Sequence, residues 1–88
     1  MKAFDLTILS PEKSVYKGRV VSLVAPAALG YLGVLANHAP LIANLKKGRI
    51  IVREDSGQQR VFQCEDKGFL EVLKNNATIL LSAGVIGG

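Results

Sequence analysis

Short runs of alternating apolar residues, each closed by turn-forming residues, constrain the fold of this chain more than any other feature. In the first run Phe4, Leu6 and Ile8 fall on one face, and Ser10-Pro11 follows. Successive side chains of a strand point to opposite faces, so each run can bury one side. Closely spaced short strands of this kind are typical of an all-β sandwich or barrel. Further strands are expected over residues 15–16, 19–25, 48–53, 60–64, 69–73 and 77–82.

Turn signals separate these runs. Residues 54–57 form a strong turn cluster, and Gly18 is expected to turn the chain. Asn75-Asn76 lies between two apolar runs and is predicted to form a two-residue hairpin, because asparagine tolerates the positive φ of a type I′ turn. No segment shows a sustained helical period, and we expect residues 1–88 to form one domain.

From Val20 to Leu45 no residue carries a formal charge. The segment is long enough to cross a bilayer, but its prolines, glycines and asparagines would break a helix repeatedly. We therefore expect a strand, a glycine-articulated loop and another short strand, with an uncharged surface available to a partner. Within this loop His38 is expected to hydrogen-bond the backbone, to contact a partner, or to do both.

Groups that could carry out catalysis are scarce. One histidine and one cysteine cannot form a zinc-type cluster or a disulfide. Cys64 is interpreted as a small, half-buried strand residue, and the acidic pairs at residues 54–55 and 65–66 as turn formers. Gly30-x-x-Gly33 lacks the lysine of a phosphate loop, so its glycines are expected to supply positive φ or close chain approach. We predict no enzyme, and no catalytic, cofactor-binding or metal-binding residue or small-molecule substrate.

The formal net charge of +4 suggests a nucleic-acid partner, but the distribution of charge argues against one. Basic residues are scattered along the chain, and aromatic residues for base stacking are few and not interleaved with them. We interpret the charge as serving solubility or an acidic protein partner. The densest basic group consists of Lys46, Lys47, Arg49 and Arg53.

Residues 26–41 and the following Leu45-Lys46-Lys47-Gly48 resemble the signature of the epsilon subunit of F-type ATP synthases. That family shows a Gly-x-x-Gly, an aliphatic pair and a Gly-His-Ala-Pro-Leu box, and Asn37 stands here where the family has the glycine before histidine. Residues 5–12 are similar to the family's opening strand. Residues 68–72 are similar to its Gly-Gly-x-x-Glu-Val strand, with Lys67 at the first glycine. These ordered motifs cover essentially the whole chain.

The resemblance implies a fold and a role. The fold would be an all-β, ten-stranded antiparallel β-sandwich of two five-stranded sheets. The role would be that of a non-catalytic central-stalk (rotor) subunit, which clamps the gamma subunit to the c-ring and couples proton flow to ATP synthesis. By position, c-ring contacts are implied at Leu29, Gly30, Tyr31 and Leu32, with Tyr31 the most exposed. Gamma contacts are implied at Ser10, His38, Ala43 and Asp66.

The resemblance also bears on location and on charge. It implies a peripheral subunit at the cytoplasmic face of the bacterial plasma (inner) membrane, without membrane insertion. Acidic residues common in the family's loop are replaced by Leu29 and Tyr31, which argues against a charge-based contact there.

Family members usually continue into a two-helix C-terminal domain, whereas this chain ends in the glycine-rich residues 84–88. We therefore expect the sandwich domain alone, able to couple but not to inhibit through those helices. The residues alone leave a second function open: a free-standing β-sandwich module that binds a peptide or a ligand in the uncharged region at residues 30–40.

Overall fold

The computed structural model describes residues 2–82 and 86–87; Met1, residues 83–85 and Gly88, which include much of the glycine-rich end, lie outside the described residues. Within the described part the chain forms strands and no helix, which confirms the all-β class. The strands are β1 (Phe4–Leu9), β2 (Ser14–Ala27), β3 (Gly30–Leu35), β4 (Leu41–Leu45), β5 (Gly48–Glu54), β6 (Gln59–Cys64), β7 (Gly68–Leu73), β8 (Asn76–Leu81) and β9 (Ile86–Gly87).

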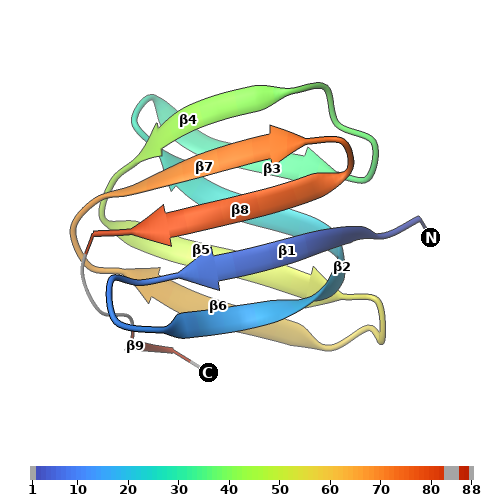
Figure 1. Ribbon diagram of the computed structural model, residues 1–88, viewed down its shortest axis with the longest axis horizontal. Helices are drawn as coiled ribbons and strands as arrows, with labels where there is room; N and C mark the ends of the chain where they lie inside the picture. Colours follow the sequence, from blue (N-terminus) through green and yellow to red (C-terminus); the bar gives the residue numbers. More distant parts are fainter. Residues whose placement is uncertain (1, 83–85, 88) are drawn as a thin grey trace.

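The long strand β2 belongs to both layers of the sandwich (Figure 1). Its first half pairs with β1, and its second half pairs with β3 and β5. The register with β5 shifts between Val20 and Ser22, and such a bulge bends a strand and increases its twist. One layer therefore contains β4, β7, β8, β1 and the first half of β2. The other layer contains β3, the second half of β2, β5, β6 and β9.

The sandwich differs in two details from the one that the resemblance implies. The described residues form nine strands rather than ten, although counting β2 once in each layer gives five strand segments per layer. The pairing is also not wholly antiparallel, since β1 and β8 run parallel from Asp5↔Asn76 to Leu9↔Leu80. The first strand thus lies between β2 and β8 and is not an edge strand of its layer.

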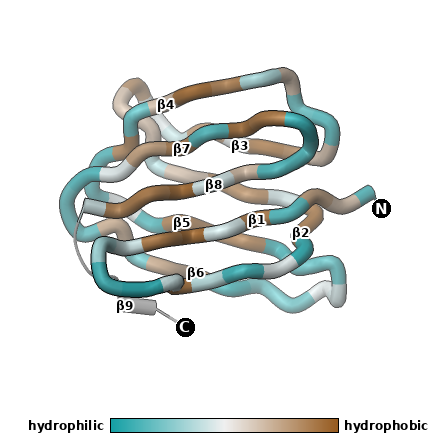
Figure 2. Tube along the Cα trace, in the orientation of Figure 1, coloured by the Kyte–Doolittle hydropathy of each residue, from teal (hydrophilic) through white to brown (hydrophobic). Residues whose placement is uncertain are grey.

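The core lies between the two layers and is made by the inward faces of the alternating runs. Phe4, Leu6 and Ile8 are fully buried, as the alternation of the first run predicted. Burying a side chain of this size stabilises the fold by about 1.5–3 kcal/mol. Figure 2 shows hydrophobic residues along the strands and mainly hydrophilic residues in the turns. Opposite β1 and β8, the second layer contributes Leu23, Ala25, Val34, Ile50, Val52, Phe62 and Cys64.

The prediction of a turn at Gly18 is wrong, because β2 continues through it and Gly18 pairs with Leu6. A Cβ atom at this position would lie 2.6 Å from the hydroxyl oxygen of Tyr16. The Tyr16 hydroxyl donates a hydrogen bond of 2.6 Å to Oε2 of Glu54. Glycine is therefore needed at position 18 for close approach within a strand, not for a turn.

The predicted hairpin between β7 and β8 is present, but it lies one residue earlier. Leu73 pairs with Asn76, so the two turn residues are Lys74 and Asn75. Both have positive φ, 51° and 61°, as a type I′ turn requires. A lysine thus occupies a backbone conformation that the sequence had assigned to asparagine.

The uncharged segment from Val20 to Leu45 forms the second half of β2, β3 and β4, with their connections. The expectation of a glycine-articulated loop between two strands is therefore wrong for residues 30–35, which form strand β3 and pair with β2. No helix capable of crossing a membrane occurs in residues 2–82 or 86–87.

Candidate functional site

The turn between β2 and β3 projects an apolar side chain into solvent. Ala27 pairs with Gly30, so Ala28 and Leu29 form a two-residue turn, and Leu29 is fully exposed. In Figure 2 this turn is pale brown, whereas most other turns are teal. Gly30 has a φ of 135°, so one of the two glycines supplies the expected positive φ. Gly33 does not, and a Cβ atom there would have no neighbour within 4 Å.

Tyr31 was expected to be the most exposed of the implied ring contacts, but Leu29 is more exposed, at 103% against 61%. The Tyr31 hydroxyl accepts a hydrogen bond of 3.4 Å from the backbone N–H of Arg49. It would also lie 3.1 Å from a Cβ atom at Gly48. Part of the Tyr31 ring is therefore held against the start of β5, whereas Leu29 forms the exposed tip of the turn.

A groove of about 400 Å³ lies between this turn and β4. Its lining combines the turn and β3, residues 27–32, with Ile42, Ala43 and Asn44 of β4. Two backbone hydrogen bonds fix the turn against β4 and its connection to β5, from Ala28 to the Asn44 carbonyl at 3.0 Å and from Lys46 to the Pro26 carbonyl at 2.8 Å. All four implied ring contacts and one implied gamma contact, Ala43, thus line one depression.

The four implied gamma contacts do not form one cluster. Ser10 follows β1, where its hydroxyl donates to the Lys13 carbonyl at 3.3 Å. Asp66 lies in the β6–β7 connection, at the end of the sandwich to which the β2–β3 turn also belongs. His38 lies in the β3–β4 loop at the opposite end of the strands (Figure 1). Ala43 lies in the middle of β4.

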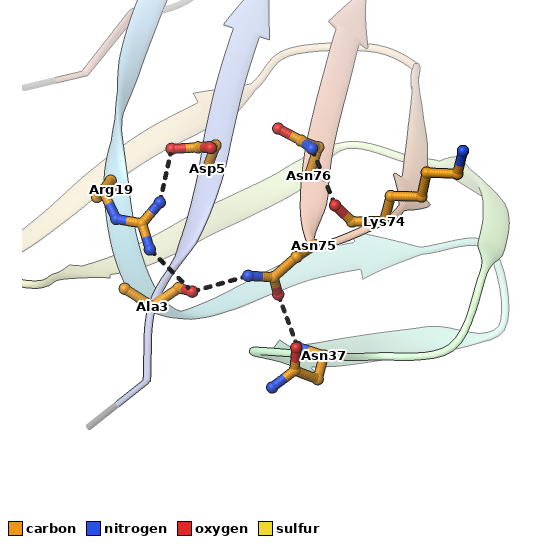
Figure 3. Close-up of polar contacts among 7 residues, drawn as sticks. All are labelled: Ala3, Asp5, Arg19, Asn37, Lys74, Asn75 and Asn76. Atoms are coloured by element: carbon orange, nitrogen blue, oxygen red, sulfur yellow. Dashed lines mark hydrogen bonds and ion pairs between the residues drawn. The ribbon is translucent and has the colours of Figure 1, made fainter.

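His38 orders its own loop, as expected from the sequence. Its Nδ1 donates a hydrogen bond of 2.7 Å to the carbonyl of Ala39. The preceding residue, Asn37, has a φ of 63°, which confirms that this position requires a residue tolerant of positive φ. The backbone N–H of Asn37 donates to Oδ1 of Asn75 at 2.7 Å (Figure 3).

Polar contacts continue from Asn75 to the N-terminal segment (Figure 3). The Ala3 carbonyl accepts hydrogen bonds from Nδ2 of Asn75 at 3.0 Å and from Nη2 of Arg19 at 3.3 Å. Nη1 of Arg19 also pairs with Oδ1 of Asp5 at 3.2 Å. Both side chains of this ion pair are more than half exposed, so the pair itself contributes little stability.

A second exposed apolar surface, on the outer face of β4, β7 and β8, was not singled out from the sequence. Phe69 pairs with Leu80 on one side and with Asn44 on the other, and Ile42 is exposed nearby. A hollow of about 340 Å³ adjoins Phe69 and Leu80. The run 68–73 already shows apolar residues on both of its faces. Only the strand pairing shows that the outward ones meet those of β4 and β8.

A cluster of polar contacts connects the first half of β2 to β6. The Tyr16 hydroxyl donates to Glu54, Nε of Arg60 lies 3.9 Å from the same Oε2 atom, and the Arg60 guanidinium lies 5.7 Å from the centre of the Tyr16 ring. Burial and, second, the hydrogen bond to Glu54 raise the pKa of Tyr16 to about 12. The phenol therefore stays protonated and acts as a donor, which suits a structural contact.

Cys64 is fully buried rather than half-buried. Burial raises the pKa of its thiol, and a hydrogen bond from the Asp66 backbone opposes this effect. A buried, protonated thiol is a poor nucleophile. In the part of the chain that the structure describes, no three His, Cys, Asp or Glu residues are grouped so that they could hold a metal ion.

Sequence comparison finds that residues 3–86 match the family model of the ATP synthase delta/epsilon chain, β-sandwich domain. The chain is 42% identical over 77 residues to the ATP synthase epsilon chain of Dichelobacter nodosus, covering 88% of this chain and 53% of that one. It is 39% identical over 79 residues to the epsilon chain of Chlorobium limicola, covering 90% and 89%. The chain thus spans about half of the first relative and most of the second.

Structural comparison supports the same fold. A chain in the mitochondrial ATP synthase structure of Euglena gracilis, described as OSCP/F1/c-ring, superposes with a TM-score of 0.88 at 20% identity. The match covers 97% of this chain and 53% of that one. A chain in the central stalk/c-ring structure of the Tetrahymena thermophila enzyme gives a TM-score of 0.76 at 17% identity, covering 93% and 64%.

Proposed function

This chain belongs to the ATP synthase delta/epsilon-chain β-sandwich family, and from that membership we propose that it is a non-catalytic rotor subunit of a proton-translocating F-type ATP synthase. The observation that carries the proposal is the family match over residues 3–86, nearly the whole chain. In this role the domain clamps the gamma subunit to the c-ring, so that proton-driven rotation reaches the catalytic head. It would act peripherally, at the cytoplasmic face of a bacterial plasma membrane.

The proposed ring contact is the β2–β3 turn with its groove. Leu29 is fully exposed, Tyr31 is partly exposed, and neither is charged. Exposed apolar side chains of this kind gain about 25 cal/mol for each Å² that a partner covers. Two backbone hydrogen bonds hold the turn to β4 and the β4–β5 connection. A turn fixed in this way can transmit force from the partner to the sandwich instead of bending.

The proposed gamma contacts are Ser10, His38, Ala43 and Asp66. Ser10 and Asp66 lie towards one end of the strands and His38 at the other. A gamma subunit that reaches all four must therefore extend along the length of the sandwich. Contacts separated in this way resist twisting of one subunit against the other better than a single cluster would.

Binding to isolated partners tests the proposal. The purified chain should bind purified gamma subunit and restore proton-coupled ATP synthesis to membranes depleted of their epsilon subunit. Failure of both would contradict the rotor function.

A substitution at the turn tests the ring contact. Leu29→Asp should weaken association with c-ring by about tenfold or more, because an aspartate must then be desolvated against an apolar partner. The free energy of unfolding of Leu29→Asp should stay within about 0.5 kcal/mol of wild type, since Leu29 has no core contact to lose. Leu73→Asp is the matched control, an exposed leucine at the opposite end of the strands. Equal losses in both variants would argue against a specific ring contact at Leu29.

The groove itself favours the second function, that of a free-standing peptide- or ligand-binding module. A volume of about 400 Å³ lies within the range of small-molecule sites. The two functions differ in which partner should protect the groove's backbone amides from hydrogen exchange. Under the rotor function, c-ring and not a free peptide should shield the amides of residues 28–32 from hydrogen exchange.

A further inference from the structure

Asn75 connects three segments that lie far apart in the sequence (Figure 3). Its Nδ2 donates to the Ala3 carbonyl at 3.0 Å, and its Oδ1 accepts from the Asn37 N–H at 2.7 Å. Its backbone carbonyl accepts from the N–H of Asp5 at 3.3 Å. One turn residue thus holds the entry to β1, the β3–β4 loop and the start of β8 together.

The chemistry of this position fits asparagine and few other residues. A side-chain amide carries both a donor and an acceptor, and both are used here. The backbone at Asn75 also has a φ of 61°, which asparagine tolerates. Aspartate would keep the acceptor and lose the donor, whereas glycine would suit the turn and lose both contacts.

On the loop side, the contact from Asn75 fixes the residue just before His38. Asn37 holds a φ of 63°, and its N–H is the group bound by Oδ1 of Asn75. His38 then donates from Nδ1 to the carbonyl of Ala39 at 2.7 Å. In the neutral ring this leaves Nε2 as a hydrogen-bond acceptor in a defined direction. The direction of the imidazole therefore depends on the backbone of Asn37.

We infer that Asn75 is a positioning residue for partner binding: it fixes the β3–β4 loop so that His38 meets the partner in one orientation. The inference rests on the proposed function, in which His38 contacts gamma. Asn75 acts through Asn37 and needs no contact with gamma of its own. A loop that is already ordered loses less conformational entropy on binding, so the affinity is higher.

A double-mutant cycle on the affinity for purified gamma subunit tests this inference. Asn75→Gly suits the type I′ turn and should fold. Alone it should weaken binding by about three- to tenfold, the effect of one lost hydrogen bond. His38→Ala should weaken binding to a similar degree. In the double variant the two losses should not multiply, because a loop without the imidazole has nothing left to position.

Asn75→Asp is the control for a merely structural role. It keeps the acceptor for the Asn37 N–H and removes the donor to Ala3, so its affinity should stay within about twofold of wild type. If Asn75→Asp weakened binding as much as Asn75→Gly, the contact with Ala3 would be the one that matters, and the inference would be overturned. Losses that multiply in the double variant would also overturn it.

Hydrogen exchange of the Asn37 amide provides a readout that needs no partner. Asn75→Gly should speed its exchange by about tenfold relative to wild type, and Asn75→Asp should not. Unchanged exchange in Asn75→Gly would refute the positioning role. If the amide responds as expected but neither wild type nor any variant binds gamma, the proposed function is at fault, and the loop contact stands.

Discussion

Tyr16 shows how a single residue joins the two layers of the sandwich. It extends from the first half of β2 to Glu54 at the end of β5, and the centre of its ring lies 5.4 Å from the centre of the Phe62 ring on β6. Gly18 makes this reach possible, because any side chain there would meet the Tyr16 hydroxyl. The residues of this cluster hold one another in position, so a substitution at one of them should alter the packing of the others.

Removal of the Tyr16 hydroxyl should destabilise the domain in a pH-dependent way. Tyr16→Phe should lower the free energy of unfolding by about 1.5–3 kcal/mol at pH 8, the value of a hydrogen bond to a charged acceptor. The folded pKa of about 12 lies above the ordinary value of 10.0, so the contribution of the phenol is complete below pH 10. It is lost as the pH rises from 10 to 12.

Urea denaturation of wild type and Tyr16→Phe across this pH range measures the effect. The difference in unfolding free energy between the two proteins should shrink towards zero between pH 10 and 12. Comparison with the variant cancels the titration of the lysines, which also occurs there. A difference that stayed constant up to pH 12 would show that the hydroxyl is not held as described.

Cys64 should be unreactive while the domain is folded. Its thiol is buried and has a raised pKa, so a reagent cannot reach the sulfur and little of the reactive thiolate is present. An aromatic disulfide reagent at pH 8 should label it only at the rate of unfolding, and addition of urea should accelerate labelling sharply. Rapid labelling in buffer would contradict this burial.

At the scale of elements, the β7–β8 turn is the clearest place where a substitution should increase stability. Lys74 holds a φ of 51°, a conformation that asparagine adopts more readily. Lys74→Asn should therefore raise the free energy of unfolding by about 0.5 kcal/mol without disturbing Asn75. Lys74→Ala removes the same charge but not the strain, and it serves as the control in thermal denaturation. The prediction is wrong if the two variants are equally stable.

The strands themselves were largely predictable, because each depends on a local pattern. The alternation of Phe4, Leu6 and Ile8 shows in the sequence which face is buried. The pattern does not show which strands pair, and the errors arise there. The prediction of a turn at Gly18 failed because the contact that requires glycine there is made by the Tyr16 hydroxyl, whose position depends on the distant Glu54. The hairpin was misplaced by one residue because pairing between β7 and β8, not turn preference alone, sets which residues turn.

The candidate site was predictable to a smaller extent. The uncharged run predicted an apolar surface in this region, but not the two-residue β2–β3 turn that makes Leu29 rather than Tyr31 the most exposed residue. That Ala43 lines the same groove, or that Asn75 holds the loop of His38, depends on contacts between residues more than 10 positions apart in the chain. No local pattern contains such information. The resemblance supplied the residues without showing how far apart they lie.

At the scale of the whole molecule, β2 makes the two layers one cooperative unit. Leu6→Ala should cost about 2–5 kcal/mol, since the side chain is fully buried. Because β2 is shared, the loss should appear equally in both layers. Amide exchange protection should fall by the same factor in β8, beside the substitution, and in β6, in the far layer. Thr7→Ala, on the outward face of the same strand, is the control. Protection in β6 that survived Leu6→Ala would instead indicate two separately stable layers.

The parallel pairing of β1 with β8 has a consequence for how the domain is made on the ribosome. About 70 residues separate the two strands, and at roughly 5–20 residues per second their synthesis is some 4–14 s apart. During this interval β1 can form a hairpin with β2, but its other edge has no neighbour, and Phe4, Leu6 and Ile8 have no core to enter. The nascent chain therefore exposes the apolar face of β1 from the time this strand is made until β8 has also been made. Slower translation should lengthen that exposure, and a chaperone that binds short apolar strands should prefer this N-terminal stretch.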